Sequence, residues 1–265
     1  MPFAEITIGI DPEIDLGPLT IAWHGIGIAA GIAAGGWLAS RFAAEQRLSR
    51  ERLINLVVLI AVAGIVGSRL FFLAEQDPAA LVNPAEWLGT RGFSFYGAML
   101  LGVAAVGFAL WRRGLDRAYL DALAAGFPLG LAVGRIGDVI NGEHYGGPSD
   151  APWAIRYTHP DAEVPVTGVA YHSGGLYEVL LGLAMLAVIW PLRHRFKTPT
   201  QLLWVVVAAY AAGRFVIFFF RDDSDELAAG LSNGQWTSLV LIAVSVAAAS
   251  IVGRRRRPIF RSRAR

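Results

Sequence analysis

The chain has 265 residues, of which 55% are hydrophobic and only 17% are charged, and its formal net charge is +2. Soluble domains average about 25% charged residues, so the composition excludes an ordinary water-soluble protein. The chain contains no cysteine. Disulfides, catalytic thiols and thiolate metal ligands within the chain are therefore excluded.

Apolar segments follow one another along the sequence, each close to the roughly 20 residues with which a helix crosses a bilayer. The seven segments cover residues 18–40, 53–74, 93–111, 118–137, 174–192, 199–220 and 236–253. Several carry glycine and alanine at close spacing, which lets membrane helices approach closely. The short alternating segments typical of a transmembrane β-barrel are missing from the sequence. The sequence predicts an all-α polytopic membrane protein that forms a single domain over residues 1–265.

The distribution of charge predicts the orientation of these helices. Residues 1–17 contain acidic residues and no lysine or arginine, the opposite of a signal peptide's basic start, so we expect a retained first helix and an outside N-terminus. Most of the 23 basic residues fall in alternate loops and in the tail at 254–265. By the positive-inside rule these segments and the C-terminus are cytoplasmic. The basic tail therefore indicates topogenic charge and attraction to anionic lipids rather than nucleic-acid binding.

Two of the outside connections are longer than the rest. Residues 75–92 contain PAALVNPAEW, which predicts a short interfacial helix. Residues 138–173 are rich in proline, glycine and threonine and include β-prone stretches such as WAIRY. They predict a small extracytoplasmic substructure between the fourth and fifth helices, built of turns and about two strands.

Ionisable residues lie in or beside these apolar segments, where they are costly unless they face a cavity and have a partner. They are His24, Arg69, Asp121, Arg135, Asp138, Glu143, Glu178 and Arg214. The predicted topology puts most of them in the outer half of the membrane. The arginines outnumber the nearby carboxylates there, which predicts a positive pocket for an anionic lipid head group, because arginine holds phosphate in a bidentate manner. The alternative is internal ion pairing, of Arg135 with Asp138 or Asp121 and of Arg214 with Glu178, and both can hold together.

The stretch GRIGDVINGEHYGG, residues 134–147, concentrates charge and glycine at one helix end. Its glycines, including Gly134 and Gly137, are expected to let the backbone leave the helix and turn, and Asn141 to satisfy freed backbone groups. Non-helical backbone at the depth of the membrane is tolerated only where it is buried in protein or lines a water-filled cavity. His144 and Tyr145 are expected to be loop or interfacial residues. The histidines are too scattered along the chain to predict a metal site.

This stretch resembles the signature of the bacterial prolipoprotein diacylglyceryl transferases. Further blocks follow in the order of that family: GSRLFF at 67–72, GFSFYGAMLLG at 92–102, HSGGLYE at 172–178 and YAAGRFVIFFFRDD at 210–223. The resemblance covers nearly the whole chain. It implies a multi-pass enzyme of the bacterial plasma (inner) membrane, with no metal, no organic cofactor and no nucleic-acid partner.

The family moves the diacylglyceryl group of phosphatidylglycerol onto the lipobox cysteine of a prolipoprotein signal peptide and releases glycerol phosphate. By this resemblance the partners are phosphatidylglycerol, the prolipoprotein and membrane lipids. Arg135 and Arg214 are expected to hold the phosphate and stabilise its leaving charge. Glu143, His24 or Asp138 is expected to take the thiol proton, with Tyr96 also in the catalytic set. The expected substrate-binding residues are Arg69, Asp121, Asp138, Asn141, Gly146, Tyr210 and Arg221.

The sequence departs from the family pattern at several positions. Tyr96 stands where the family has a histidine, and His24 stands where the family commonly has a tyrosine. If both side chains face one cavity, His24 replaces the lost histidine as the base. Asp138 replaces the signature asparagine, and Phe218 replaces a glutamate. The alternatives are a relative with a changed lipid donor or acceptor, and a non-enzymatic lipid-binding or transport protein, which would carry charged groups in both halves of the membrane.

Overall fold

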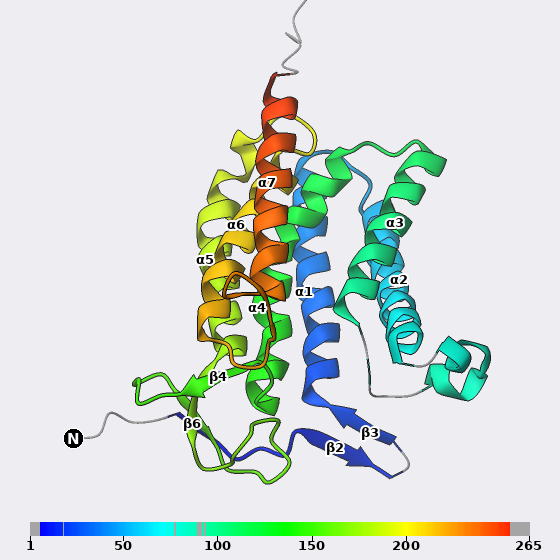
Figure 1. The fold of residues 1–265 in the computed structure, drawn as a ribbon. Helices are drawn as coiled ribbons and strands as arrows, with labels where there is room; N and C mark the ends of the chain where they lie inside the picture. Colours follow the sequence, from blue (N-terminus) through cyan, green and yellow to red (C-terminus); the bar gives the residue numbers. More distant parts are fainter. Residues whose placement is uncertain (1–5, 18, 77, 89–91, 93, 255–265) are drawn as a thin grey trace, which may run out of the picture. The chain divides into compact units, whose positions relative to one another are not determined.

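The computed structural model describes residues 6–17, 19–76, 78–88, 92 and 94–254 (Figure 1). Among them, seven helices are long and apolar enough to cross a membrane. They are α1 Trp23–Glu45, α2 Arg50–Gln76, α3 Phe95–Arg113, α4 Ala118–Asn141, α5 Gly174–Leu192, α6 Gln201–Ile217 and α7 Asn233–Arg254. The predicted all-α polytopic membrane fold is confirmed. Except for Arg254, the basic tail lies outside the described residues.

The contacts within the chain divide it into two compact units. The first unit joins Met1–Ala39 with Leu120–Arg265, and the second is Ser40–Tyr119. The first unit therefore holds most of α1 together with α4, α5, α6 and α7, and the second holds α2 and α3. The single domain expected over the whole chain stays a prediction.

Helix α4 runs four residues further than the apolar segment at 118–137 predicted. Asp138 and Asn141 therefore lie on its last turn, and the connection to the following strand begins at Gly142, whose φ of 83° suits glycine. The expectation that Gly134 and Gly137 release the backbone from the helix is wrong. Both are helical, and their role is close packing.

Helices α1 and α4 cross with glycine against glycine. The facing residues are Gly27, Gly31 and Gly35 of α1 and Gly126, Gly130, Gly134 and Gly137 of α4. A Cβ atom added to Gly31 would lie 2.6 Å from the carbonyl oxygen of Gly130, and one added to Gly35 would lie 3.1 Å from that of Gly126. The two backbones are thus in direct contact, as small residues at spacings of four allow in membrane helices.

The other helices of the first unit pack around α4. A Cβ at Gly182 of α5 would lie 2.8 Å from the carbonyl oxygen of Pro128 in α4, so these helices also approach closely. Proline at position 128 leaves the backbone without one donor, yet the helix continues through it. Helix α6 packs against both α5 and α7. This arrangement brings the last turn of α4 beside the first turns of α1 and α5.

A small four-stranded sheet lies at that end of α4. Its strand order is β1-β5-β6-β4, with β1 Ile6–Ile8, β5 Ile155–Tyr157, β6 Ala170–Ser173 and β4 Tyr145–Pro148. Strand β1 pairs parallel with β5, and the other pairs are antiparallel. The sequence predicted about two strands in the excursion, whereas the structure has three there, completed by one from the N-terminal segment.

The sheet is anchored to α4 by a buried tyrosine. Tyr157 packs with Ile155 and Ala162 in a small apolar core. Its hydroxyl donates a 2.8 Å hydrogen bond to the carbonyl oxygen of Val139 in α4. Burial raises the pKa of Tyr157 to about 12, so the hydroxyl keeps its proton and remains a donor at neutral pH.

Two hairpins, β2 Glu13–Leu16 with β3 Leu19–Ala22 and β7 Glu226–Ala228 with β8 Leu231–Ser232, lead into α1 and α7.

The second unit is a pair of helices with a structured connection. Helices α2 and α3 pack at Gly67, where an added Cβ would lie 2.6 Å from the Cβ of Leu101. Between them, the expected interfacial helix at 75–92 is instead two 3-10 helices, η1 Pro78–Val82 and η2 Pro84–Leu88. Proline starts each of them, where its missing donor and fixed φ favour a helix start.

The close contact of α1 with α4 predicts that substitutions at two nearby glycines of α1 will differ in their effect on stability. We expect Gly31→Ala to destabilise the protein by about 1–3 kcal/mol, because the methyl group would force the two backbones apart. Gly25→Ala is the matched control, since a Cβ at Gly25 meets nothing within 4 Å. Thermal unfolding of the purified variants in detergent measures this difference. Equal unfolding midpoints would show that the crossing tolerates a side chain.

Candidate functional site

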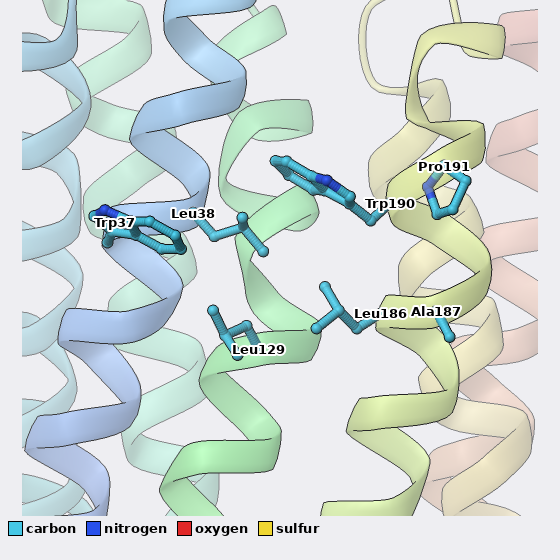
Figure 2. A pocket seen from close by; sticks show the side chains of 7 residues that line it. All are labelled: Trp37, Leu38, Leu129, Leu186, Ala187, Trp190 and Pro191. Carbon is cyan, nitrogen blue, oxygen red and sulfur yellow. The ribbon is translucent and has the colours of Figure 1, made fainter.

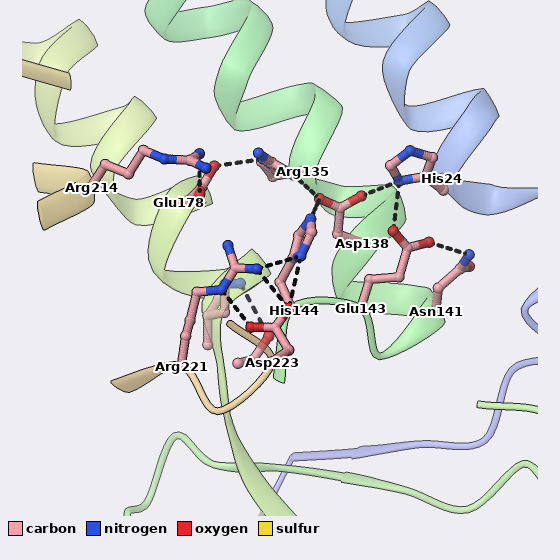
Figure 3. Close-up of polar contacts among 12 residues, drawn as sticks. His24, Arg135, Asp138, Asn141, Glu143, His144, Glu178, Arg214, Arg221 and Asp223 are labelled. Carbon is pink, nitrogen blue, oxygen red and sulfur yellow. Dashed lines mark hydrogen bonds and ion pairs between the residues drawn. The ribbon is translucent and has the colours of Figure 1, made fainter. Parts of the chain in front are cut away.

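Charged and polar side chains from every helix around the end of α4 form one connected set (Figure 3). This set, called the polar cluster below, lies entirely within the first unit. Its members are His24, Arg135, Asp138, Asn141, Glu143, His144, Glu178, Arg214, Arg221 and Asp223. The structure thus brings together predicted site residues that are far apart in sequence: His24, Arg135, Asp138, Asn141, Glu143, Arg214 and Arg221.

His24 contacts two carboxylates through one ring nitrogen. Its Nδ1 lies 2.6 Å from Oδ1 of Asp138 and 2.9 Å from Oε2 of Glu143. The other oxygen of Glu143 accepts a hydrogen bond of 3.0 Å from Nδ2 of Asn141. The approach depends on Gly137, because a Cβ there would lie 2.9 Å from Cα of His24. Glycine at this position thus lets the imidazole reach the last turn of α4.

A buried carboxylate of α5 joins the two arginines expected to bind phosphate. Nε of Arg135 lies 2.6 Å from Oε2 of Glu178, and NH1 of Arg214 lies 3.4 Å from Oε1. Arg135 also pairs with Asp138. Asp138 and Glu178 are each only 1% exposed. Buried charges of this kind need partners, and both carboxylates have them.

Arg214 and Arg221 both contact one aromatic ring. The guanidinium carbon of Arg214 is 4.8 Å from the ring centroid of Phe218, and that of Arg221 is 4.4 Å from it. Arg214 also donates a 2.9 Å hydrogen bond to the hydroxyl of Tyr210. Cation–π contacts of this kind stabilise a guanidinium without neutralising its charge. Tyr210 thus helps to position Arg214, and the contact with substrate expected for Tyr210 stays a prediction.

His144 links the helix end to the loop after α6. Its Nε2 lies 3.6 Å from Oδ2 of Asp138, and its Nδ1 lies 3.3 Å from Oδ2 of Asp223. Arg221 donates to both oxygens of Asp223, at 2.7 Å and 2.6 Å. Burial raises the pKa of Asp223, but hydrogen bonds from His144 and Arg221 outweigh it and lower the pKa to about 2. The carboxylate therefore stays ionised at neutral pH.

With both histidines neutral, the three arginines of the polar cluster face four carboxylates, which corrects the expected surplus of positive charge. Each of its three arginines pairs with at least one of its four carboxylates. The predicted pairs of Arg135 with Asp138 and of Arg214 with Glu178 are confirmed. The cluster becomes net positive only when both His24 and His144 carry a proton. Binding of a phosphate must therefore be accompanied by protonation of these histidines or by displacement of a carboxylate.

Asp121 lies at the other end of α4 and is not part of the polar cluster. Its two carboxylate oxygens accept hydrogen bonds from the backbone nitrogens of Thr200, at 2.6 Å, and Leu203, at 2.9 Å. It thereby caps the N-terminus of α6, a position that favours a negative side chain. At 1.5 Å per residue it stands about 20 Å along the helix from Arg135. The alternative pair of Asp121 with Arg135 is therefore wrong, whereas the expected role of Asp121 in substrate binding stays a prediction.

Two other predicted site residues belong to the second unit. Arg69 is buried, and its guanidinium donates to the carbonyl oxygens of Glu86, at 2.8 Å, and Gly92, at 2.9 Å. It thus holds the connection between α2 and α3. The ring of Tyr96 packs edge-on against Phe95 at 5.8 Å. A meeting of Tyr96 with His24 in one cavity stays a prediction.

Gly146 has a packing role in β4. A Cβ there would collide with the carbonyl group of Phe220 and lie 3.0 Å from Cβ of His172. Glycine is therefore needed for β4 to lie against the end of α6 and its following 3-10 helix, η4 Phe218–Phe220. The direct contact with substrate expected for Gly146 stays a prediction.

Three groups of the polar cluster have the spacing of a metal site. One nitrogen of His24 and one oxygen each of Asp138 and Glu143 lie within 4.8 Å of one another. A nitrogen with two carboxylate oxygens could hold a divalent cation. The scattered histidines gave no sign of this group, because it combines a single histidine with two carboxylates from a distant segment.

His144 lies in the loop between α4 and β4, as predicted, and has a positive φ of 62°. Its contacts with Asp138 and Asp223, and the presence of Asp223 in the polar cluster, were not predicted. The place of His144 inside the charged stretch at 134–147 was the available signal. Asp223 follows Arg221 by two residues in RDD, a spacing at which the two side chains can pair in an extended segment.

The family model described as prolipoprotein diacylglyceryl transferase matches residues 13–251. The chain belongs to this family. The match runs from β2 into α7, so it includes the whole polar cluster. The resemblance of the sequence to the family is thereby confirmed.

Curated members of the family are similar to the chain over most of its length. The phosphatidylglycerol–prolipoprotein diacylglyceryl transferase of Mesorhizobium japonicum is 31% identical over 95% of this chain and 92% of the relative. That of Bordetella parapertussis is 35% identical over 88% of this chain and 92% of the relative. That of Azotobacter vinelandii is 35% identical over 82% and 83%, respectively.

Because Glu178 contacts both Arg135 and Arg214, we expect its substitution to have a large effect on stability. We expect Glu178→Gln to lower the free energy of unfolding by about 3–5 kcal/mol, because it leaves two partly buried arginines with one counter-charge fewer. Glu226→Gln, in the exposed strand β7, should change it by no more than about 0.5 kcal/mol. Unfolding in detergent with increasing SDS measures both. A Glu178→Gln variant as stable as the control would show that the arginines do not depend on this carboxylate.

Proposed function

We propose that the chain transfers the diacylglyceryl group of phosphatidylglycerol to the lipobox cysteine thiol of a prolipoprotein. One observation carries this proposal. Two arginines that share a carboxylate lie beside a histidine–carboxylate pair at one end of membrane-spanning helices, in a chain similar over most of its length to enzymes named for this reaction. The arginines suit a lipid phosphate, and the histidine suits a thiol proton.

The distribution of basic residues supports the orientation that this reaction needs. With an outside N-terminus, the start of α1 and the end of α4 lie at the outer face of the bacterial plasma (inner) membrane. The polar cluster then faces the side on which a prolipoprotein presents its cysteine. Phosphatidylglycerol in the outer leaflet would reach the cluster laterally, with its acyl chains between helices and its phosphate among the arginines.

The bond changes set the requirements of the site. The sulfur of the thiol attacks the glycerol carbon that bears the phosphate, so a carbon–sulfur bond forms as the carbon–oxygen bond breaks. The electron pair of the broken bond stays on the phosphate oxygen, and glycerol phosphate leaves with an additional negative charge. Arg135 and Arg214 are already oriented, and they stabilise that charge without further ordering. The thiol proton must pass to a base.

His24 is the residue best arranged to act as that base. An ionised carboxylate accepts but does not donate, so the Nδ1 that contacts Asp138 and Glu143 carries the hydrogen. In the neutral form that a base requires, Nε2 has the free lone pair, and the side chain is 37% exposed. The carboxylates stabilise the imidazolium that forms, in the manner of a catalytic triad.

The departures from the family pattern support this assignment. His24 and Asp138 occupy positions where the family commonly has tyrosine and asparagine, and here their side chains are in direct contact at 2.6 Å. A histidine gains from a carboxylate partner, whereas a tyrosine and an asparagine make a neutral pair. The two departures therefore act as one unit, and they supply a base in a chain that has Tyr96 in place of the family histidine.

A transporter is less well supported. In the described part of the first unit, the charges buried between helices gather at one end, and Asp121 at the other end is used to cap α6. A transport route would need polar groups along its length. The arrangement favours a reaction at one face of the membrane.

The arginine requirement is testable in a bacterium depleted of its own transferase. We expect the intact chain to restore growth, and Arg135→Ala to lower transfer to a lipobox peptide by about 10²–10³-fold, the usual effect of removing a charge-stabilising group. Arg117→Ala, which removes an exposed arginine outside the cluster, is the control. Immunoblots of the membrane fraction check insertion. Full activity of Arg135→Ala would refute the assigned role, and failure of the intact chain to act on phosphatidylglycerol would refute the proposed function.

The role of His24 is testable by chemical rescue. We expect His24→Ala to lower kcat by about 10²–10⁴-fold with little change in KM for the lipid, because a base acts on the chemical step. Added imidazole should restore part of the rate, since it can enter the space left by the side chain. His159→Ala, outside the polar cluster, should keep the rate of the intact chain. Loss of activity without rescue would point to Glu143 or Asp138 as the base.

A further inference from the structure

A second feature of the first unit lies away from the polar cluster. It is an apolar groove with a volume of about 340 Å³ (Figure 2). Its walls are formed by Trp37 and Leu38 of α1, Leu129 of α4, and Leu186 and Trp190 of α5. All the side chains that line it are apolar. Its volume lies within the range of roughly 300–1,000 Å³ typical of small-molecule sites.

The groove lies towards the basic end of the helices. Trp37 follows His24 by thirteen residues on α1, which at 1.5 Å per residue is about 20 Å. Trp190 stands two residues before the end of α5, where η3 Arg193–Arg195 begins. The hydrocarbon core of a bilayer is about 30 Å thick, so a lipid held at the polar cluster and a lipid held here belong to opposite leaflets.

A cation is fixed at the rim of the groove. The guanidinium carbon of Arg193 lies 4.0 Å from the ring centroid of Trp190, and its NH1 donates a 2.5 Å hydrogen bond to the Trp190 carbonyl oxygen. His194 and Arg195 follow directly. Tryptophan and arginine together at a helix end mark the level of lipid head groups. An apolar groove with basic residues at its rim has the chemistry of an anionic phospholipid, which pairs acyl chains with a phosphate.

We propose that this groove binds an anionic phospholipid of the leaflet at the basic end, with one acyl chain along Leu129 and Leu186 and its phosphate at Arg193. The site is distinct from the polar cluster, and its occupant is a bound lipid rather than the donor substrate. A lipid in the groove would contact α1, α4 and α5 together. It would do so at the end of these helices opposite the polar cluster. The binding does not require the transferase reaction.

Native mass spectrometry of the purified full chain tests this proposal. The chain is delipidated in detergent and exposed to equal amounts of phosphatidylserine and phosphatidylcholine with identical acyl chains. We expect one retained phosphatidylserine in preference to phosphatidylcholine, both in the intact chain and in Arg135→Ala, where the polar cluster is disrupted. The readout is a mass adduct, so it is independent of whether the chain is active as a transferase.

Matched variants assign the lipid to the groove. Ala187→Trp fills the groove and should abolish the adduct, whereas Val188→Trp, at a neighbouring position that is 60% exposed and outside the groove, should not. Arg193→Gln should weaken phosphatidylserine retention roughly fivefold, as expected for one basic residue at an anionic lipid. Arg195→Gln removes the same charge from the same loop and should weaken it less.

Several results would overturn the proposal. Equal retention of phosphatidylcholine would refute selectivity for an anionic lipid, and an adduct unchanged by Ala187→Trp would place the lipid elsewhere. If Ala187→Trp instead altered how transfer depends on the acyl-chain length of the donor, the groove would hold the tail of the substrate. Loss of transferase activity with an unchanged adduct would leave the groove proposal intact and count only against the proposed function.

Discussion

The direct backbone contact of α1 with α4 is the constraint on which the polar cluster depends. Glycines on both helices let carbonyl groups and Cα atoms pack directly against each other. That contact fixes the register of the two helices, and a slip by one turn would move His24 about 5.4 Å relative to Asp138. The 2.6 Å contact between these side chains therefore follows from residues that carry no chemistry of their own.

The electrostatics of the cluster follow from its burial. An unpaired guanidinium or carboxylate between membrane helices would be costly, so the three arginines are kept as ion pairs before any substrate arrives. Glu178 serves two of them at once. A phosphate that binds there exchanges one set of charge contacts for another, rather than filling an empty positive pocket. Such an exchange orients the lipid. It also keeps each arginine paired, so that no guanidinium faces hydrocarbon without a partner.

The sequence was sufficient to predict the helices, because twenty apolar residues in succession have few alternatives in water or lipid. It also identified most cluster residues, since a charge inside an apolar segment is rare enough to be informative. It could not tell which neighbour each charge meets. Asp121 and Asp138 lie on the same helix and look alike in sequence, yet one caps α6 and the other contacts His24. The same limit applies to Gly134 and Gly137, because a glycine in sequence does not show whether it turns the chain or faces another helix.

The parallel pairing of β1 with β5 has a consequence for biosynthesis. Ile6 pairs with Ile155, so the first strand of the chain finds its partner only after α1 to α4 have been synthesised and inserted. Pairing over such a separation in sequence forms slowly, because the intervening loop must close first. Until then the N-terminal strand is unpaired outside the helices. The sheet therefore completes only after α4 has been inserted, and Tyr157 of β5 holds it to the end of that helix.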